Sequence, residues 1–178
     1  MALASAHDLD STSANPDSRA TPAQARISLD PATTRQAGLN GGWWPRSLDA
    51  SAELPGLIAE VNSRSGRISR VALQADAFSQ IPPLLVVGGR KVHVAWFRYM
   101  NTHTVILTMA GGRDDLVLLV IPPQAEPAAA AEALRLASSG GDAGRPDAIL
   151  AAAGVTVLRA EPSGPPSGTK KSRSAGTW

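Results

Sequence analysis

The chain has 178 residues, of which 43% are hydrophobic and 18% are charged, and its formal net charge is +2. The length and the hydrophobic content favour a single domain that can bury its own core. It contains no cysteine, which excludes disulfides, thiol nucleophiles and thiolate metal sites and fits a reducing, cytoplasmic compartment. The longest apolar run, residues 116–121, is far shorter than the roughly 20 residues that span a bilayer, and the N-terminus has no secretory leader pattern, so we expect no membrane partner.

The composition of both ends sets the expected domain boundaries. Residues 1–25 lack hydrophobic periodicity and residues 162–178 are rich in Pro, Gly and Ser, so neither segment can bury enough apolar surface to offset the entropy of ordering. We predict disordered segments over 1–25 and 162–178 and a folded domain over 26–138. Residues 139–161 are predicted to be a glycine-rich linker with a short helical appendix, which either docks on the domain or stays partly disordered.

The first predicted element is a strand over residues 26–30, where apolar and polar side chains alternate. The block Gly-Gly-Trp-Trp-Pro-Arg-Ser follows at 41–47, and the glycine pair and the proline indicate a loop that holds two adjacent indoles. A helix is predicted next, because four apolar residues recur at helical spacing. They are Leu54, Leu57, Ile58 and Val61. Asp49 or Ser51 can cap this helix, and Pro55 is tolerable only within its first turn.

Five strand candidates follow, separated mostly by short turns. They cover residues 68–73, 84–87, 91–98, 104–109 and 116–121. Glycine pairs at 88–89 and 111–112 predict hairpins, which are too short for parallel crossovers. Residues 126–137 are rich in alanine and predict a closing helix. We therefore expect an α+β fold, with an antiparallel sheet of about five to six strands, a helix after the first strand and a closing C-terminal helix.

The candidate ligand site is built around the tryptophan block. Trp43 and Trp44 could stack on a planar or cationic ligand while Arg46 holds an anionic group, and Arg98 and His103 could complete the site. The alternative is structural: one indole fills the core beneath the first helix, and Arg46 pairs with an acid such as Asp30 or Asp49. Both interpretations remain open from the sequence.

No constellation of residues indicates an enzyme, a metal or a cofactor. His93 and His103 are on different predicted strands without a metal-ligand spacing, and the aspartates at 114 and 115 are ordinary turn residues after a glycine pair. No serine lies in a nucleophile elbow, and residues 88–89 lack the lysine and helix of a phosphate loop. We expect no catalytic residue, no metal and no cofactor.

The C-terminal tail carries a small basic cluster, Lys170, Lys171 and Arg173, with no acidic residue nearby. Such a cluster can attract nucleic acid, although three charges are fewer than a typical basic tract and equally describe a solvated end.

Several blocks resemble one bacterial family. These are residues 26–30, 41–47, 53–55, 87–92, 96–98 and 103–105. Together they resemble an actinobacterial family that is a domain of unknown function, over roughly residues 26–138, with Lys91 in place of an expected second arginine. The resemblance implies a bacterial origin and a domain boundary, and it implies no activity.

These observations predict a small bacterial cytoplasmic domain that is a non-enzymatic binding or regulatory module, with an unknown small ligand or protein as its partner. The alternative is a nucleic-acid-associated protein that uses its arginines and its basic tail. The third hypothesis is an enzyme with an unrecognised site, which a pocket holding His103 close to a carboxylate would favour.

Overall fold

The computed structural model describes residues 25–31, 38–112, 115–139 and 145–156 of the chain. Its elements are β1 (Ile27–Leu29), β2 (Gly41–Trp43), α1 (Ala50–Arg64), β3 (Ile68–Gln74), β4 (Leu84–Val87), β5 (Arg90–Phe97), β6 (Thr104–Met109), β7 (Asp115–Val120), α2 (Pro127–Ser138) and α3 (Pro146–Ala152). None of the helices found in these ranges has the length and apolar character needed to cross a membrane.

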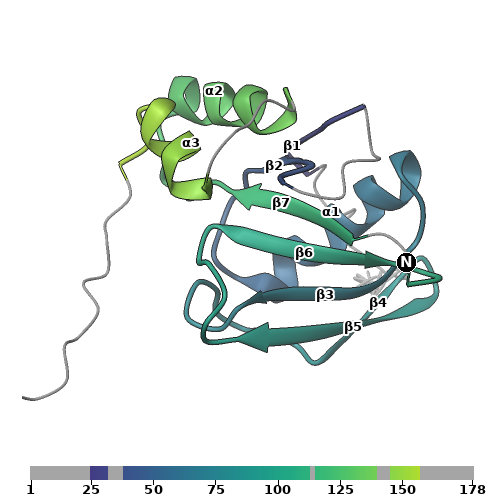
Figure 1. Ribbon diagram of the computed structural model, residues 1–178. Coiled ribbons are helices and arrows are strands. Elements are labelled where there is room, and N and C mark those ends of the chain that lie inside the picture. The colour runs from purple at the N-terminus through teal and green to yellow at the C-terminus, as the bar shows by residue number, and fades with distance from the viewer. Residues whose placement is uncertain (1–24, 32–37, 113–114, 140–144, 157–178) are drawn as a thin grey trace, which may run out of the picture.

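The strands form one seven-stranded sheet in the order β1-β2-β7-β6-β3-β5-β4 (Figure 1). The α+β class is confirmed, but the prediction of an antiparallel sheet of five to six strands is wrong. The sheet is mixed, because β2 pairs parallel with β7 and β3 pairs parallel with β5. The second parallel pair arises because the β4/β5 hairpin sets β5 against β3 and leaves β4 at the edge, although the chain reaches β4 first.

The tryptophan block supplies the strand that the sequence did not predict. Gly41–Trp43 was expected to be a loop, yet it pairs antiparallel with β1 and parallel with β7. Glycine is depleted in strands, so local propensity gave no signal here. The two neighbouring strands satisfy the backbone of β2, and this tertiary pairing outweighs the local preference.

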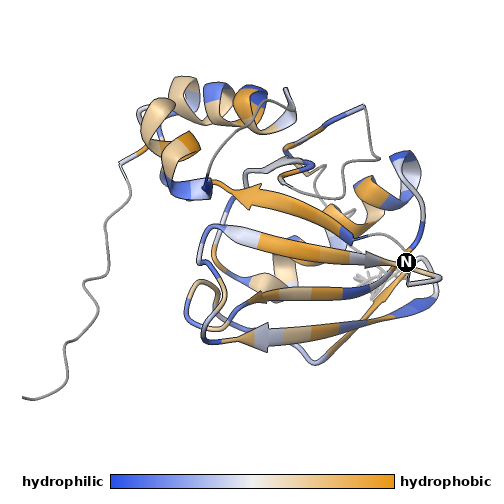
Figure 2. Cartoon of the chain, viewed as in Figure 1, coloured by the Kyte–Doolittle hydropathy of each residue, from blue (hydrophilic) through white to orange (hydrophobic). Residues whose placement is uncertain are grey.

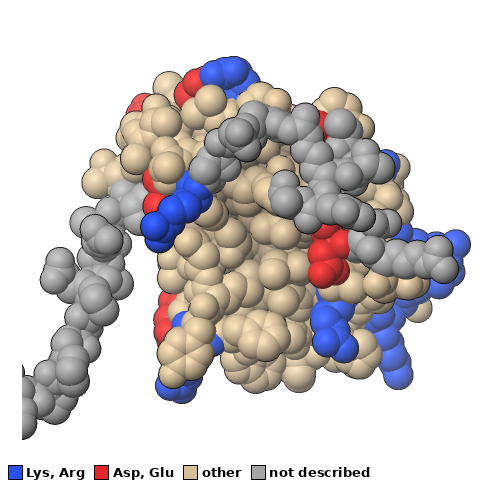
Figure 3. All heavy atoms as spheres, viewed as in Figure 1, with Lys and Arg blue, Asp and Glu red and all other residues tan. Residues whose placement is uncertain are grey.

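The helices cover the sheet in two layers (Figure 1). α1 lies on one face, and α2 with α3 lies on the other face over β1, β2 and β7. The uncovered remainder of that second face, over β6, β3 and β5, has few charged side chains at its centre (Figure 3). The appendix that contains α3 docks on the domain, since its residues Ile149 and Leu150 are buried.

β7 has a core on each of its faces. Leu116, Leu118 and Val120 point into the first core, which lies between α1 and the sheet, whereas Leu119 and Ile121 point into the second core beneath α2 and α3. Burial on both faces explains the continuous apolar run, which Figure 2 shows along most of β7.

α1 begins as the sequence predicts, because the Asp49 carboxylate accepts hydrogen bonds from the backbone N–H groups of Ser51 and Ala52. Pro55, however, lies in the second turn of the helix rather than the first. The ring removes the backbone bond to residue 51, which is exposed, so water can satisfy that carbonyl and the helix continues to Arg64.

The close packing of β2 makes a testable prediction about Gly41. Its φ of +151° is unfavourable for other residues, and a Cβ there would overlap the backbone oxygen of Ser28. We expect Gly41→Ala to lower the free energy of unfolding by at least about 3 kcal/mol, measured by urea titration of tryptophan fluorescence.

Gly38 is the matched control, since its φ is +118° and nothing lies within 4 Å of a Cβ built there. Gly38→Ala should cost only the backbone strain, about 1 to 2 kcal/mol. Equal losses for the two variants would contradict the close approach of β1 and β2.

Candidate functional site

The two adjacent tryptophans point to opposite faces of the sheet. Trp43 is 1% exposed in the first core, and its ring stacks on Phe78 with a centroid distance of 5.7 Å and an interplanar angle of 9°. Trp44 is half-buried and packs against the second core. One indole thus contributes to each core.

Arg26 covers the outer side of Trp44. Its guanidinium carbon lies 3.5 Å from the centroid of the indole, Nε donates to the Trp44 carbonyl at 3.1 Å, and Nη2 donates to the Pro45 carbonyl at 2.8 Å. The pKa of Arg26 is lowered, first by burial and then by the nearby charge of Arg46, while Glu53 opposes the shift. A planar guanidinium that stacks and donates at the same time holds this segment in place.

The Glu53 carboxylate fixes the chain before α1. It accepts hydrogen bonds from the Arg46 backbone N–H at 3.1 Å and from the Ser47 hydroxyl at 3.0 Å. The side chain of Arg46 itself is exposed. The block at 41–47 therefore joins β2 to α1 through specific bonds.

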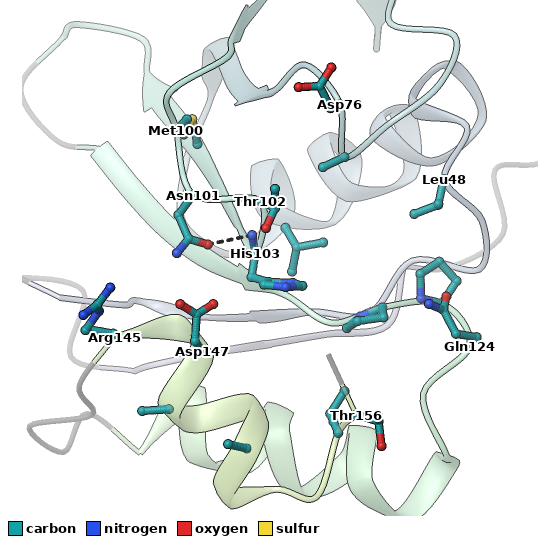
Figure 4. A pocket seen from close by; sticks show the side chains of 17 residues that line it. Leu48, Asp76, Met100, Asn101, Thr102, His103, Gln124, Arg145, Asp147 and Thr156 are labelled. Carbon is teal, nitrogen blue, oxygen red and sulfur yellow. Dashed lines mark hydrogen bonds between the residues drawn. The ribbon is translucent and has the colours of Figure 1, made fainter. Parts of the chain in front are cut away.

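A cavity of about 970 Å³ opens at the end of the sheet that leads to α3 (Figure 4). The turn before β6 forms one wall with residues 100–103, α3 forms the opposite wall, and the segment after β7 forms the floor with Pro122, Pro123 and Gln124. Leu48 and the loop at 76–77 close the far side.

His103 lies in the middle of this cavity, and its backbone is held on both sides (Figure 4). Its N–H donates to the Asn101 side-chain oxygen at 2.7 Å, and its carbonyl accepts from Val120 N–H at 2.8 Å. Burial lowers the pKa of His103 below its usual 6.5, against an opposing influence from the negative charge of Asp147. A hydrogen bond with the Val120 backbone also opposes the effect of burial, but the lowered pKa still favours the neutral imidazole, which has one donor and one acceptor nitrogen.

Three charged residues surround the imidazole. Asp147 comes from the first turn of α3, Arg145 directly precedes this helix, and Asp76 comes from the loop at 76–77 on the far side (Figure 4). The Asp76 carboxylate accepts a hydrogen bond from the Gln74 side chain at 3.0 Å. Within the ranges that the structure describes, the Asp147 carboxylate forms no hydrogen bond or ion pair, so it is available to a ligand.

The structure does not bring the five predicted ligand residues into one cavity. His103 lines it, whereas Trp43, Trp44, Arg46 and Arg98 do not. Arg98 is exposed in the turn after β5, where its carbonyl accepts from Gln74. The alternative site at Lys170, Lys171 and Arg173 lies outside the described residues.

Local sequence patterns contained little signal for the other residues of the cavity. Asp147 lies in the segment predicted as a short helical appendix, and its place opposite His103 depends on where that appendix docks. Among the residues whose placement is described, no group of three or more His, Asp or Glu side chains could hold a metal ion.

Comparison with known proteins gives one match. A protein-family model described as a family of unknown function (DUF5994) matches residues 26–137. No curated protein and no solved structure matches the chain. The matched region includes His103 and Asp76 but ends before α3, which supplies the remaining charges of the cavity.

The first prediction for this region concerns the titration of His103. Its pKa, measured from the imidazole signals by NMR, should lie below 6.5, and Asp147→Asn should lower it further because a stabilising negative charge is lost. A lowered pKa means that His103 binds a proton more readily in the unfolded chain than in the folded chain. The free energy of unfolding should therefore fall as the pH drops through about 6.5.

Glu132→Gln on α2 is the control, because Glu132 is an exposed carboxylate outside the cavity. It should leave the His103 titration unchanged. A pKa above 6.5, or one that Asp147→Asn fails to move, would contradict the described surroundings of His103.

The second prediction concerns Arg26. Arg26→Lys keeps the charge but loses the planar stack and one of the two donor positions, so it should lower the free energy of unfolding by about 1 to 2 kcal/mol. Urea unfolding followed by tryptophan fluorescence measures this loss, and Arg135→Lys on the exposed side of α2 is the control. If neither Arg26→Lys nor Arg135→Lys lowers the free energy of unfolding, Arg26 does not hold the segment at Trp44 and Pro45 in place.

Proposed function

Since the chain belongs to the family of unknown function DUF5994, we propose its function from geometry: it is a small bacterial cytoplasmic module that binds a small polar ligand in the cavity beside His103. The observation that carries this proposal is a cavity of about 970 Å³ that contains a neutral imidazole and an unpaired carboxylate within the described part of the chain. Cavities of roughly 300 to 1,000 Å³ suit small molecules.

The charges around the cavity favour a ligand with both a cationic and an anionic group. Asp147 and Asp76 can accept hydrogen bonds from a protonated amine, and Arg145 can hold a carboxylate with two parallel hydrogen bonds. His103 lies between Asp76 and Asp147, and Arg145 lies beyond Asp147 (Figure 4), so the imidazole can also bond to the ligand. A free amino acid or a similar zwitterion has this chemistry.

The cavity is a better location for the ligand than the tryptophan block. Trp43 is enclosed in the first core, and Arg26 already occupies the outer side of the Trp44 ring. In this proposal the block at 41–47 supports the floor of the cavity, because the Trp43 carbonyl accepts from Ile121 N–H at 2.9 Å just before Pro122.

A specific observation also favours a second candidate, an enzyme that transfers a proton. The imidazole of His103 shares the cavity with the Asp147 carboxylate, which raises its basicity, and this pair can serve as a general base. Mass spectrometry of each bound compound after prolonged incubation tests this candidate. Conversion by the wild-type chain but not by His103→Gln would favour the enzyme over the binding module.

The binding proposal is tested by thermal shift and calorimetry with three groups of probes. These are free amino acids, small amines without a carboxylate and small carboxylates without an amine. We expect at least one amino acid to raise the melting temperature, and Asp147→Asn and Arg145→Gln each to weaken its binding about tenfold or more, because each removes a hydrogen bond to a charged group.

Glu132→Gln is again the matched control, and it should bind as the wild-type chain does. The proposal fails if no compound from the three groups changes the melting temperature. It also fails if Asp147→Asn and Arg145→Gln bind the best compound as tightly as the control.

A further inference from the structure

A second surface lies apart from the cavity, on the half of the sheet that α2 and α3 leave open. Alternation assigns its side chains, since Val71, Leu73, Val92 and Val94 point into the first core with α1. Side chains at the alternate positions of β3, β4 and β5 point the other way, and eight of these residues form what we call the open face. They are Arg70, Ala72, Leu84, Val86, Lys91, His93, Ala95 and Phe97. None of these eight lines the cavity.

The part of the chain that carries the open face is basic. Residues 67–99, which the structure describes without a gap, contain one acidic residue, Asp76, which lines the cavity. The same stretch contains five basic residues, all exposed. They are Arg67, Arg70, Arg90, Lys91 and Arg98. Figure 3 shows Lys and Arg side chains at the margin of this face around an uncharged centre, and some Asp or Glu side chains at the same margin.

Aromatic side chains are exposed at the end of β5 beside this basic surface. Phe97 on the open face is 53% exposed, Trp96 is 50% exposed, and Tyr99 in the following turn is fully exposed. Aromatic rings are usually buried because of their large apolar area. Trp96 pairs with Leu73 and therefore points to the α1 side of the sheet. Phe97 and Tyr99 are thus the exposed rings beside the basic surface, and together they indicate a contact surface.

The register of the strands places two small side chains between these groups. Ala72 pairs with Ala95, and this small pair separates Phe97 from His93. His93 in turn lies beside Arg70 and Leu84. On one face of a strand, successive side chains are roughly 6.6 Å apart, so Ala95 is that far from both Phe97 and His93. Flat rings can therefore lie on Phe97 and on His93, with the alanine pair between them.

From this arrangement we propose that the open face binds single-stranded nucleic acid. Bases stack on Phe97 and on His93, and Arg70, Lys91 and Arg98 contact the phosphates. Charge complementarity calls for an anionic partner, and the exposed rings call for a partner with flat unpaired groups. A single strand has both properties, whereas the bases of a duplex are stacked inside it.

The test uses the full chain and fluorescence anisotropy, with labelled single-stranded DNA and RNA of about 12 nucleotides and the matching duplex. We expect the single strands to bind more tightly than the duplex. Phe97→Leu should weaken this binding about tenfold without changing its salt dependence, whereas Phe97→Tyr should keep it, because only the ring stacks.

Lys91→Gln should act differently from the aromatic change. It should reduce the slope of log affinity against log salt by about 0.7, since one phosphate contact is lost. Arg135→Gln on α2 is the control for charge and should leave affinity and slope unchanged. Circular dichroism and thermal unfolding confirm that each variant is folded.

Three results would each overturn the proposal. The first is equal affinity for the duplex and the single strand, and the second is wild-type binding by Phe97→Leu. The third is loss of binding when residues 170, 171 and 173 are changed to Gln while Lys91→Gln has no effect, since the tail would then carry the interaction.

Discussion

The close packing of β2 is the constraint on which both layers of the protein depend. Gly41 has no room for a side chain beside Ser28, and a Cβ on Gly42 would lie 3.1 Å from the Leu134 side chain of α2. Trp43 then fills the first core on the opposite face. Two residues without side chains therefore let β1 and α2 approach, and the large residue that follows supports α1. Because interiors are packed to the density of crystals, neither helix layer can shift without disturbing the other.

The same segment supports one side of the cavity through backbone hydrogen bonds. The Trp43 carbonyl holds Ile121, and the His103 carbonyl holds Val120, so the end of β7 is fixed just before the residues of the cavity floor. The opposite wall is held differently, because α3 contributes Ile149 and Leu150 to the second core. The position of Asp147 opposite His103 thus depends on apolar packing at the neighbouring positions of the same helix.

The sequence predicted the elements whose signal is local. The helical spacing of Leu54, Leu57 and Ile58 and the glycine pair at 88–89 were sufficient, because capping, amphipathicity and positive φ angles are set by near neighbours. β2 and the order of the strands depend on pairing between distant segments, which leaves no local pattern. The cavity was missed for the same reason: His103 was predicted as a candidate ligand residue, but nothing in the sequence indicated that Asp147 packs opposite it.

The family match covers the whole open face but only part of the cavity. The whole open face lies within residues 26–137, and so do His103 and the floor of the cavity. Arg145 and Asp147 lie beyond that boundary on α3. The matched region therefore supplies the sheet surface, the imidazole and Asp76, whereas Asp147 comes from a helix that docks on it. In the binding module that we propose, a change in α3 would alter the preferred ligand without disturbing the first core, since that core contains no residue of α3.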